Sequence, residues 1–183
     1  ANDANIIAKS GGAGARCFVF RLVSDGSLRL LLSAAGAVFD TTATSSVTLA
    51  SVGITNGSRC SVRADWRQSD GRVQFFYSTN QGATWTQLGA DQSILIASIF
   101  DSAAQPVEIG SGANGTVFLF VGKIYRTQLY NDITLAQDFD PSLAVPGAAS
   151  FVSMTGETYT INRSGATTAE IVASAATLAK PLV

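Results

Sequence analysis

Short segments in which apolar and polar side chains alternate with a period of two dominate this chain. The clearest are two neighbouring segments on either side of Ser69-Asp70-Gly71, a sequence typical of hairpin turns because Asp-Gly tolerates a positive φ. Their apolar positions are Cys60, Val62, Ala64 and Trp66 in the first segment and Val73, Phe75 and Tyr77 in the second. Both segments therefore predict strands of a hairpin with one buried face and one solvated face.

The residues that follow this hairpin match a turn motif. The sequence STNQGATW, from Ser78 to Trp85, fits the Asp-box pattern S-x-D-x-G-x-T-W, with Asn80 at the position of the Asp. A side-chain amide can bond the backbone two residues further on, and Gly82 supplies a free φ. We expect Ser78, Asn80, Gly82 and Trp85 to form a self-contained hairpin on which the Trp packs back. Their predicted role is structural rather than ligand-binding.

Further strand signals follow one another along the chain, with turns between them and almost no helical periodicity. The ranges are Ile6–Lys9, Cys17–Val23, Leu28–Ser33, Val107–Ile109, Val117–Leu129, Phe151–Met154, Thr158–Ile161 and Glu170–Val172, with weaker signals at Ala37–Asp40 and Ser46–Leu49. Strands at this spacing predict an all-β protein, an antiparallel β-sandwich or barrel. The expected core residues are Phe18, Phe20, Leu28, Leu30, Val62, Trp66, Phe75, Val117 and Leu119.

The composition agrees with a β-rich fold. Hydrophobic residues make up 46% and charged residues 14% of the 183 residues, and Glu and Lys, which usually furnish exposed helices, are scarce. The net charge of −1 gives no general attraction to nucleic acid or anionic membranes. No run of about 18 apolar residues, long enough to span a membrane, is present. We therefore expect neither nucleic acid nor a membrane as a partner.

The residue types needed for common catalytic sites are scarce. The chain has no histidine, which excludes Ser-His-Asp and Cys-His catalysis and histidine metal sites. The glutamates are too far apart for a paired-carboxylate glycosidase strand. Asp101, Asp132, Asp138 and Asp140 do not match a calcium-loop spacing, and we interpret them as solvated turn aspartates. The sequence thus predicts a protein without enzymatic activity and without a cofactor, calcium being the one open alternative.

The two cysteines, Cys17 and Cys60, each lie within an apolar strand pattern. Two cysteines are too few for a disulfide framework of the kind that staples small secreted domains. The favoured interpretation is two buried free thiols, and a single disulfide between strands is the alternative.

The solvated face of the predicted hairpin carries the best candidate contact residues, which are Arg63, Asp65, Arg67, Gln74 and Phe76. Three interpretations stay open. The residues can form a cross-strand ladder of ion pairs on an exposed sheet. They can form a protein interface, because Arg and aromatic residues anchor such interfaces. They can also contact the hydroxyl groups of a glycan.

The order of several phrases resembles a known family. These phrases are IIAKSG, SDGSLRLLLSAAG, RCSVRADW, VQFFYSTNQGATWTQLG, IFDSAAQPVEIGSGANG, FVGKIYRTQLYND and TGETYTINRSG. Together they are similar to the concanavalin A-like, laminin-G-like jelly-roll domain of bacteriophage structural proteins, over roughly residues 5–172. The resemblance implies a jelly-roll β-sandwich over residues 1–172. Such domains usually have one more strand before the I-x-A-K segment, so we expect either that this chain is part of a longer polypeptide or that another segment closes the edge of the sandwich.

The same resemblance implies a setting in a virion. Similar domains occur in capsid decoration, head-fibre and tail proteins, so the expected partners are other virion proteins or copies of this chain, with a host-surface glycan as a further candidate. The alternative is a free-standing carbohydrate-binding module of bacterial or viral origin. Residues 173–183 form an apolar C-terminal tail with a single charge, which we expect to dock on a partner.

Overall fold

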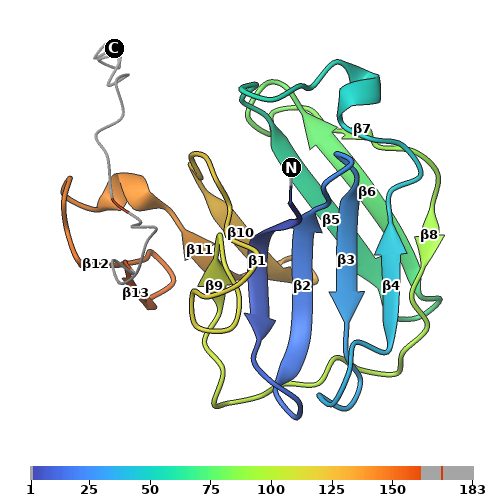
Figure 1. Cartoon of the computed structure of the whole chain (residues 1–183), viewed down its shortest axis with the longest axis horizontal. Coiled ribbons are helices and arrows are strands. Elements are labelled where there is room, and N and C mark those ends of the chain that lie inside the picture. Colours follow the sequence, from blue (N-terminus) through green and yellow to red (C-terminus); the bar gives the residue numbers. More distant parts are fainter. Residues whose placement is uncertain (1, 162–169, 171–183) are drawn as a thin grey trace. The chain divides into compact units, whose positions relative to one another are not determined.

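The computed structural model describes residues 2–161 and residue 170. The chain divides into two compact units, Ala1–Val121 and Gly122–Val183, and each is described by itself. All sheets are antiparallel, and the only helices among the described residues are two short 3-10 turns (Figure 1). The prediction of an all-β protein is therefore confirmed. None of the helices in this part of the chain is long and apolar enough to cross a membrane.

The first unit contains a five-stranded sheet in the order β4-β3-β2-β1-β9. Its strands are β1 (Ala4–Ser10), β2 (Arg16–Leu22), β3 (Leu28–Leu32), β4 (Thr41–Thr44) and β9 (Glu108–Ile109). The β2–β3 turn forms because Asp25 accepts hydrogen bonds from the backbone N–H and the hydroxyl of Ser27, while Gly26 adopts a φ of 89°. The sequence weakly predicted strands at Ala37–Asp40 and Ser46–Leu49. Both predictions are wrong, because the strand in this region is β4, which lies between the two ranges.

The second sheet of this unit is built around β6. Its strands are β5 (Ser61–Arg67), β6 (Arg72–Ser78), β7 (Thr86–Gln87) and β8 (Gln92–Ser93), and the 3-10 turn η1 (Ala50–Val52) precedes it. Strand β5 pairs with β6 along its whole length, with Trp66 opposite Val73 and Arg63 opposite Phe76. The alternation read from the sequence therefore places the apolar and polar positions on opposite faces, as predicted.

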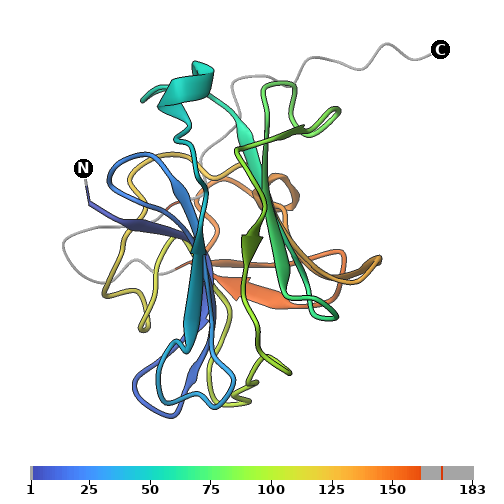
Figure 2. The ribbon, with the colours of Figure 1, turned by 90° about the vertical axis from the view of Figure 1, so that its right-hand side faces the viewer.

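Apolar side chains join the two sheets, which Figure 2 shows edge-on beside each other. Phe20 of β2 stacks on Phe75 of β6, and the buried residues of this interior also include Leu28, Leu30, Leu32, Val73, Leu88 and Ile94. Val62 and Trp66 are only half-buried, because β5 has a neighbouring strand on one side alone within the described residues. The prediction of Val117 as a core residue is wrong, since its side chain is 40% exposed. Phe18 and Leu119 are intermediate.

The opposite face of the five-stranded sheet is also apolar at its centre. Ala8, Val19 and Leu31 form a buried cluster there, and Phe39 packs against it. The expected core residues do not include this cluster, because they were chosen by alternation within strands, which places only every second residue in the interior. A strand covered on both faces has apolar side chains at successive positions.

The second unit consists of two hairpins. Its strands are β10 (Thr127–Asn131), β11 (Thr134–Phe139), β12 (Ser150–Val152) and β13 (Thr158–Thr160), with the 3-10 turn η2 (Pro141–Leu143) before β12. Phe139, Phe151 and Tyr159 pack together, with ring centroids between 5.1 and 5.6 Å apart. The prediction of one long strand at Val117–Leu129 is wrong for most of its length, since only its last three residues belong to β10. Phe118 adopts a φ of 52°, which interrupts the extended backbone near the start of this range. Apart from Glu170, the strand expected at Glu170–Val172 and the tail 173–183 lie outside the described residues.

Candidate functional site

The five residues chosen from the sequence lie together on the outer face of the second sheet. The β5–β6 register places Arg63 beside Phe76 and Asp65 beside Gln74, while Arg67 follows on β5. The guanidinium of Arg63 lies 4.2 Å from the centroid of the Phe76 ring and 5.0 Å from that of the Trp85 ring. We call this surface the Arg63 face, made of Arg63, Asp65, Arg67, Gln74, Phe76 and Trp85.

Ion pairs and hydrogen bonds cross the Arg63 face. The Arg63 Nε lies 3.0 Å from the Asp65 Oδ1, and the amides of Gln74 and Gln87 both donate to Asp91. The hydrogen bonds from the Gln74 and Gln87 side chains lower the pKa of Asp91. Partial burial raises the pKa of Asp65, although the positive charge of Arg63 acts in the opposite direction. The Arg63–Asp65 ion pair lies within β5 and the Arg67–Asp70 ion pair within the β5–β6 turn, so neither is an ion pair between facing residues of the two strands. These contacts hold the side chains in place while leaving much of their surface exposed.

The Asp-box-like hairpin satisfies its own polar groups. Asn80 Oδ1 accepts hydrogen bonds from the Thr84 N–H at 2.9 Å and the Ser78 hydroxyl at 2.7 Å. Ser78 Oγ in turn accepts from the N–H of Gly82 at 2.9 Å. A Cβ at Gly82 would lie 3.3 Å from the Trp85 ring, so Trp85 packs back on the turn. Trp85 also contacts Arg63, a connection to the β5–β6 face that the motif alone did not reveal.

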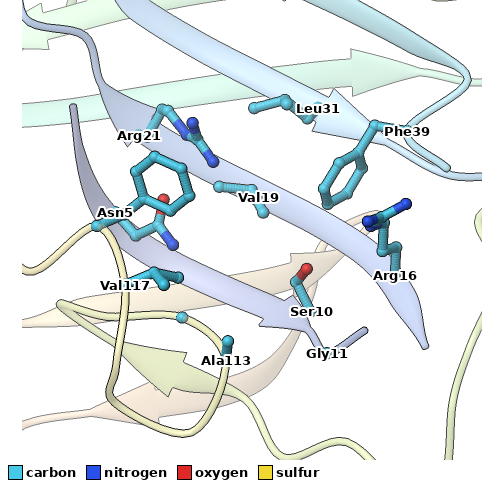
Figure 3. Close-up of a pocket in the computed structure, with 12 residues that line it drawn as sticks. Asn5, Ser10, Gly11, Arg16, Val19, Arg21, Leu31, Phe39, Ala113 and Val117 are labelled. Carbon is cyan, nitrogen blue, oxygen red and sulfur yellow. The ribbon is translucent and has the colours of Figure 1, made fainter. Parts of the chain in front are cut away.

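A pocket of about 340 Å³ opens on the opposite side of the five-stranded sheet (Figure 3). Asn5 and Arg21 lie at one end and Arg16 and Phe39 at the other, with Val19 between them. We call it the Asn5 pocket. Its lining residues are Asn5, Ser10, Gly11, Arg16, Val19, Arg21, Leu31, Phe39, Gly112, Ala113, Val117 and Phe118.

Two polar side chains at one end of the Asn5 pocket are buried without complete hydrogen bonding. Asn5 is 1% exposed and Arg21 is 7% exposed, and the two are partners in the β1–β2 register. Asn5 Nδ2 donates to the Ser111 carbonyl at 3.1 Å, and an Arg21 terminal nitrogen lies 3.5 Å from Asp3. Within the described residues, however, neither Asn5 Oδ1 nor Arg21 Nε has a partner. Desolvation lowers the pKa of Arg21 despite the nearby Asp3 carboxylate.

The segment from β9 to Phe118 forms one wall of the pocket, and the buried carboxylate of Glu108 organises it. Its oxygens accept hydrogen bonds from the N–H groups of Asn114 and Gly115 and from the Ser111 hydroxyl, at 2.8 to 3.1 Å. The Phe118 carbonyl accepts from the Asn5 N–H at 2.8 Å, which ties the end of the wall to β1. The Phe118 ring lies over the Arg21 guanidinium, 4.0 Å from it.

The sequence pattern did not predict the residues of this pocket. Asn5 and Arg21 are the polar exceptions within the otherwise apolar strands NIIA and CFVFRL. A polar residue within an apolar strand is a signal that could have identified Asn5 and Arg21, because a buried polar group needs a hydrogen-bond partner. Phe118 carries no comparable signal, since its position depends on backbone that the sequence pattern read as a strand.

The aspartates interpreted as solvated occupy different environments. The prediction that Asp138 is solvated is wrong, because this residue is 1% exposed and accepts two hydrogen bonds from the Arg126 guanidinium, at 2.6 and 2.8 Å. Asp140 caps η2 by accepting from the N–H and hydroxyl of Ser142. Asp101 is exposed and pairs with Lys9, and Asp132 is exposed in the β10–β11 turn. No three acidic or cysteine side chains come together as metal ligands among residues 2–161 and 170.

Both cysteines are free thiols. Cys17 is buried, and its sulfur accepts the N–H of Ser102 at 3.3 Å. Cys60 is only half-buried, so the expectation of burial is confirmed for Cys17 and corrected for Cys60, which directly precedes the edge strand β5. Burial raises the pKa of the Cys60 thiol.

Comparison of the chain with protein-family models, with curated proteins and with solved structures found no match in any of the three.

Proposed function

We propose that the chain is a non-enzymatic structural protein of a phage virion, a capsid decoration, head-fibre or tail component. In this proposal the first unit belongs to a concanavalin A-like β-sandwich. The Phe20–Phe75 contact between the two antiparallel sheets supports the sandwich. The order of the quoted sequence phrases supports the phage setting.

The observation that carries the proposal is that the half-buried Arg63 guanidinium lies over the rings of Phe76 and Trp85 on the outer face of the sheet. Arg and aromatic side chains are enriched in protein interfaces and provide many of their strongest contacts. The ion pair with Asp65 and the contacts with Phe76 and Trp85 hold Arg63 in one orientation before any partner binds. Less side-chain entropy is therefore lost on association. We assign the Arg63 face to contact with another virion protein or with a second copy of this chain.

Three acidic side chains, those of Glu108, Asp138 and Glu157, support a role without catalysis. Glu108 organises a backbone segment, Asp138 pairs with Arg126, and Glu157 accepts from Thr155 and Ser153 within a turn. These bonds lower the pKa of Glu157, so this carboxylate is a weak proton acceptor at neutral pH. Each of these groups is used in holding local structure.

The alternative function is a free-standing carbohydrate-binding module. The Asn5 pocket favours it, because apolar walls combined with a few polar groups are typical of small-ligand sites. The two functions are compatible if a virion protein also binds a glycan on the host surface.

Particles from the source of this chain test the virion role. We would purify them on a density gradient and quantify the chain by mass spectrometry against the major capsid component. We expect the chain to sediment with the particles at a fixed ratio across the particle peak. Recovery of the chain only from the particle-free fractions would contradict the proposed function.

A further inference from the structure

We propose that the Asn5 pocket binds a sugar residue that carries a carboxylate, with Arg16 facing the carboxylate and the Asn5–Arg21 end receiving a hydroxyl group. The pocket lies on the other sheet of the first unit from the Arg63 face, and its occupation does not depend on a role in a virion. A uronic acid or a sialic acid has the required chemistry.

The buried polar atoms at one end of the pocket define the hydroxyl position. Asn5 Oδ1 is an acceptor and Arg21 Nε–H is a donor, and both lack a partner within the described part of the chain. A buried polar atom without a partner costs free energy, so a group that can donate to one and accept from the other is stabilising there. A hydroxyl does both. A carboxylate or an apolar group satisfies at most one of the two atoms.

The Phe118 ring controls access to these atoms. It covers the Arg21 guanidinium at 4.0 Å, yet the residue is 43% exposed, so its side chain can rotate without leaving a packed core. Its backbone adopts a φ of 52°, a conformation that non-glycine residues seldom hold. Rotation of the ring opens the Asn5–Arg21 end to a ligand hydroxyl and leaves the ring at the rim of the pocket.

The middle of the pocket suits the apolar face of a sugar ring. Val19 and Leu31 are cross-strand neighbours and form the apolar surface between the two ends, with Phe39 beside them. The volume of about 340 Å³ is at the lower end of the range for ligand sites. This volume fits one or two sugar rings rather than a long extended chain.

The charge of the pocket selects an acidic sugar. Arg16 and Arg21 are its ionisable lining residues, and no acidic residue lines it. Arg21 is paired with Asp3, but no ion pair among residues 2–161 and 170 involves Arg16. Arg16 donates to the Ala37 carbonyl and lies over the Phe39 ring, which fixes its guanidinium at the end opposite Asn5. A guanidinium that is held in place but has no carboxylate partner recognises a ligand carboxylate well.

The test is binding of the full chain to oligosaccharides that carry glucuronic, galacturonic or sialic acid, each compared with its carboxyl-reduced counterpart. Titration by NMR or calorimetry would follow the natural chain and Arg16→Gln. Lys123→Gln serves as the charge-matched control, because it removes one positive charge from an exposed position in the second unit. We expect at least one acidic sugar to bind, and both carboxyl reduction and Arg16→Gln to weaken binding by about tenfold or more. Lys123→Gln should leave the affinity unchanged.

Two further variants locate the site. Phe118→Ala uncovers the Asn5–Arg21 end and should bind the acidic sugar at least as tightly as the natural chain. Arg63→Gln, on the other sheet, should bind it unchanged. The proposal is overturned if no acidic sugar binds at about 10 mM, or if the reduced sugar or Arg16→Gln binds equally well. It is also overturned if folded Phe118→Ala loses binding or if Arg63→Gln weakens binding as much as Arg16→Gln does.

Discussion

Phe20 of β2 and Phe75 of β6 stack with their ring centroids 6.4 Å apart and their planes inclined by 18°. The two rings belong to different sheets of the first unit, and both side chains are buried. Because the sheets share no ladder hydrogen bonds, contacts of this kind hold them together. The Arg63 face and the Asn5 pocket lie on the outer faces of these two sheets, away from the interior between them.

Phe75→Ala should lower the free energy of unfolding by about 3–5 kcal/mol, because it removes a fully buried ring and leaves a cavity. Trp66→Ala should cost less, since the indole is only half-buried on the edge strand, although its N–H donates to the Ile94 carbonyl at 3.0 Å. Chemical denaturation of the two variants checks this order. An equal or larger loss of unfolding free energy for Trp66→Ala would show that Trp66 on β5 is as deeply buried as Phe75 on β6.

Asn80→Ala should lower the free energy of unfolding by about 1–2 kcal/mol, because the Thr84 N–H and the Ser78 hydroxyl lose their common acceptor, Asn80 Oδ1. Asn80→Asp keeps the acceptor oxygen and should retain most of the stability. Thermal unfolding of both variants, together with sugar titration, measures the effect. Unchanged stability in Asn80→Ala, with altered ligand or partner binding, would assign the motif a binding role instead.

Gly112→Ala should destabilise the first unit by about 1–3 kcal/mol, because the added Cβ would lie 2.7 Å from Asn5 Nδ2, whose side chain is buried. Gly12→Ala is the matched control, since a Cβ there meets nothing within 4 Å. Thermal unfolding compares the two, and the amide signal of Asn5 in NMR spectra should shift only in Gly112→Ala. Equal stability of the two variants would mean that Asn5 is not held in place by the wall segment.

Stability should fall at alkaline pH through Tyr159. Burial, with the charges of Glu157 and Asp138, raises the pKa of Tyr159 from 10.0 to about 12. The folded state therefore keeps the phenol proton while the unfolded state loses it, so this contribution is fully present below pH 10.0 and is lost as the pH rises towards 12. Tyr159→Phe should flatten this dependence. Ultraviolet titration of tyrosinate should show one late-titrating tyrosine that is missing from the variant, and identical titrations would contradict the assignment.

Local patterns predicted the β5–β6 hairpin and the turn that follows it well. Alternation on both sides of Ser69-Asp70-Gly71 gave β5 and β6 and their two faces, because each strand contacts the interior on one side only. The self-bonded turn around Asn80 also follows from its motif. The Arg63 face was predictable for the same reason, since side chains at alternate positions of paired strands lie next to one another.

Long-range contacts explain the parts that the sequence pattern missed. The positive φ of Phe118 breaks an apolar run that reads as one long strand. The sequence pattern predicts Asp138 as a turn residue, yet Arg126, directly before the neighbouring strand β10, compensates its charge and allows burial. The Asn5 pocket needs a wall from β9 to Phe118 to lie against β1, about a hundred residues away in sequence. No local pattern specifies such a contact.

Competition between variants for incorporation into particles shows whether the Arg63 face holds the chain in a virion. Particles would be assembled with equal amounts of the natural chain and either Arg63→Gln or Lys123→Gln, and mass spectrometry would measure the ratio incorporated. If the Arg63 face holds the chain in the virion, Arg63→Gln should be under-represented by about tenfold while folding normally, because interface arginines are frequent hot spots. Lys123→Gln should be incorporated equally with the natural chain. Equal incorporation of Arg63→Gln would show that the Arg63 face is not the contact that holds the chain in the particle.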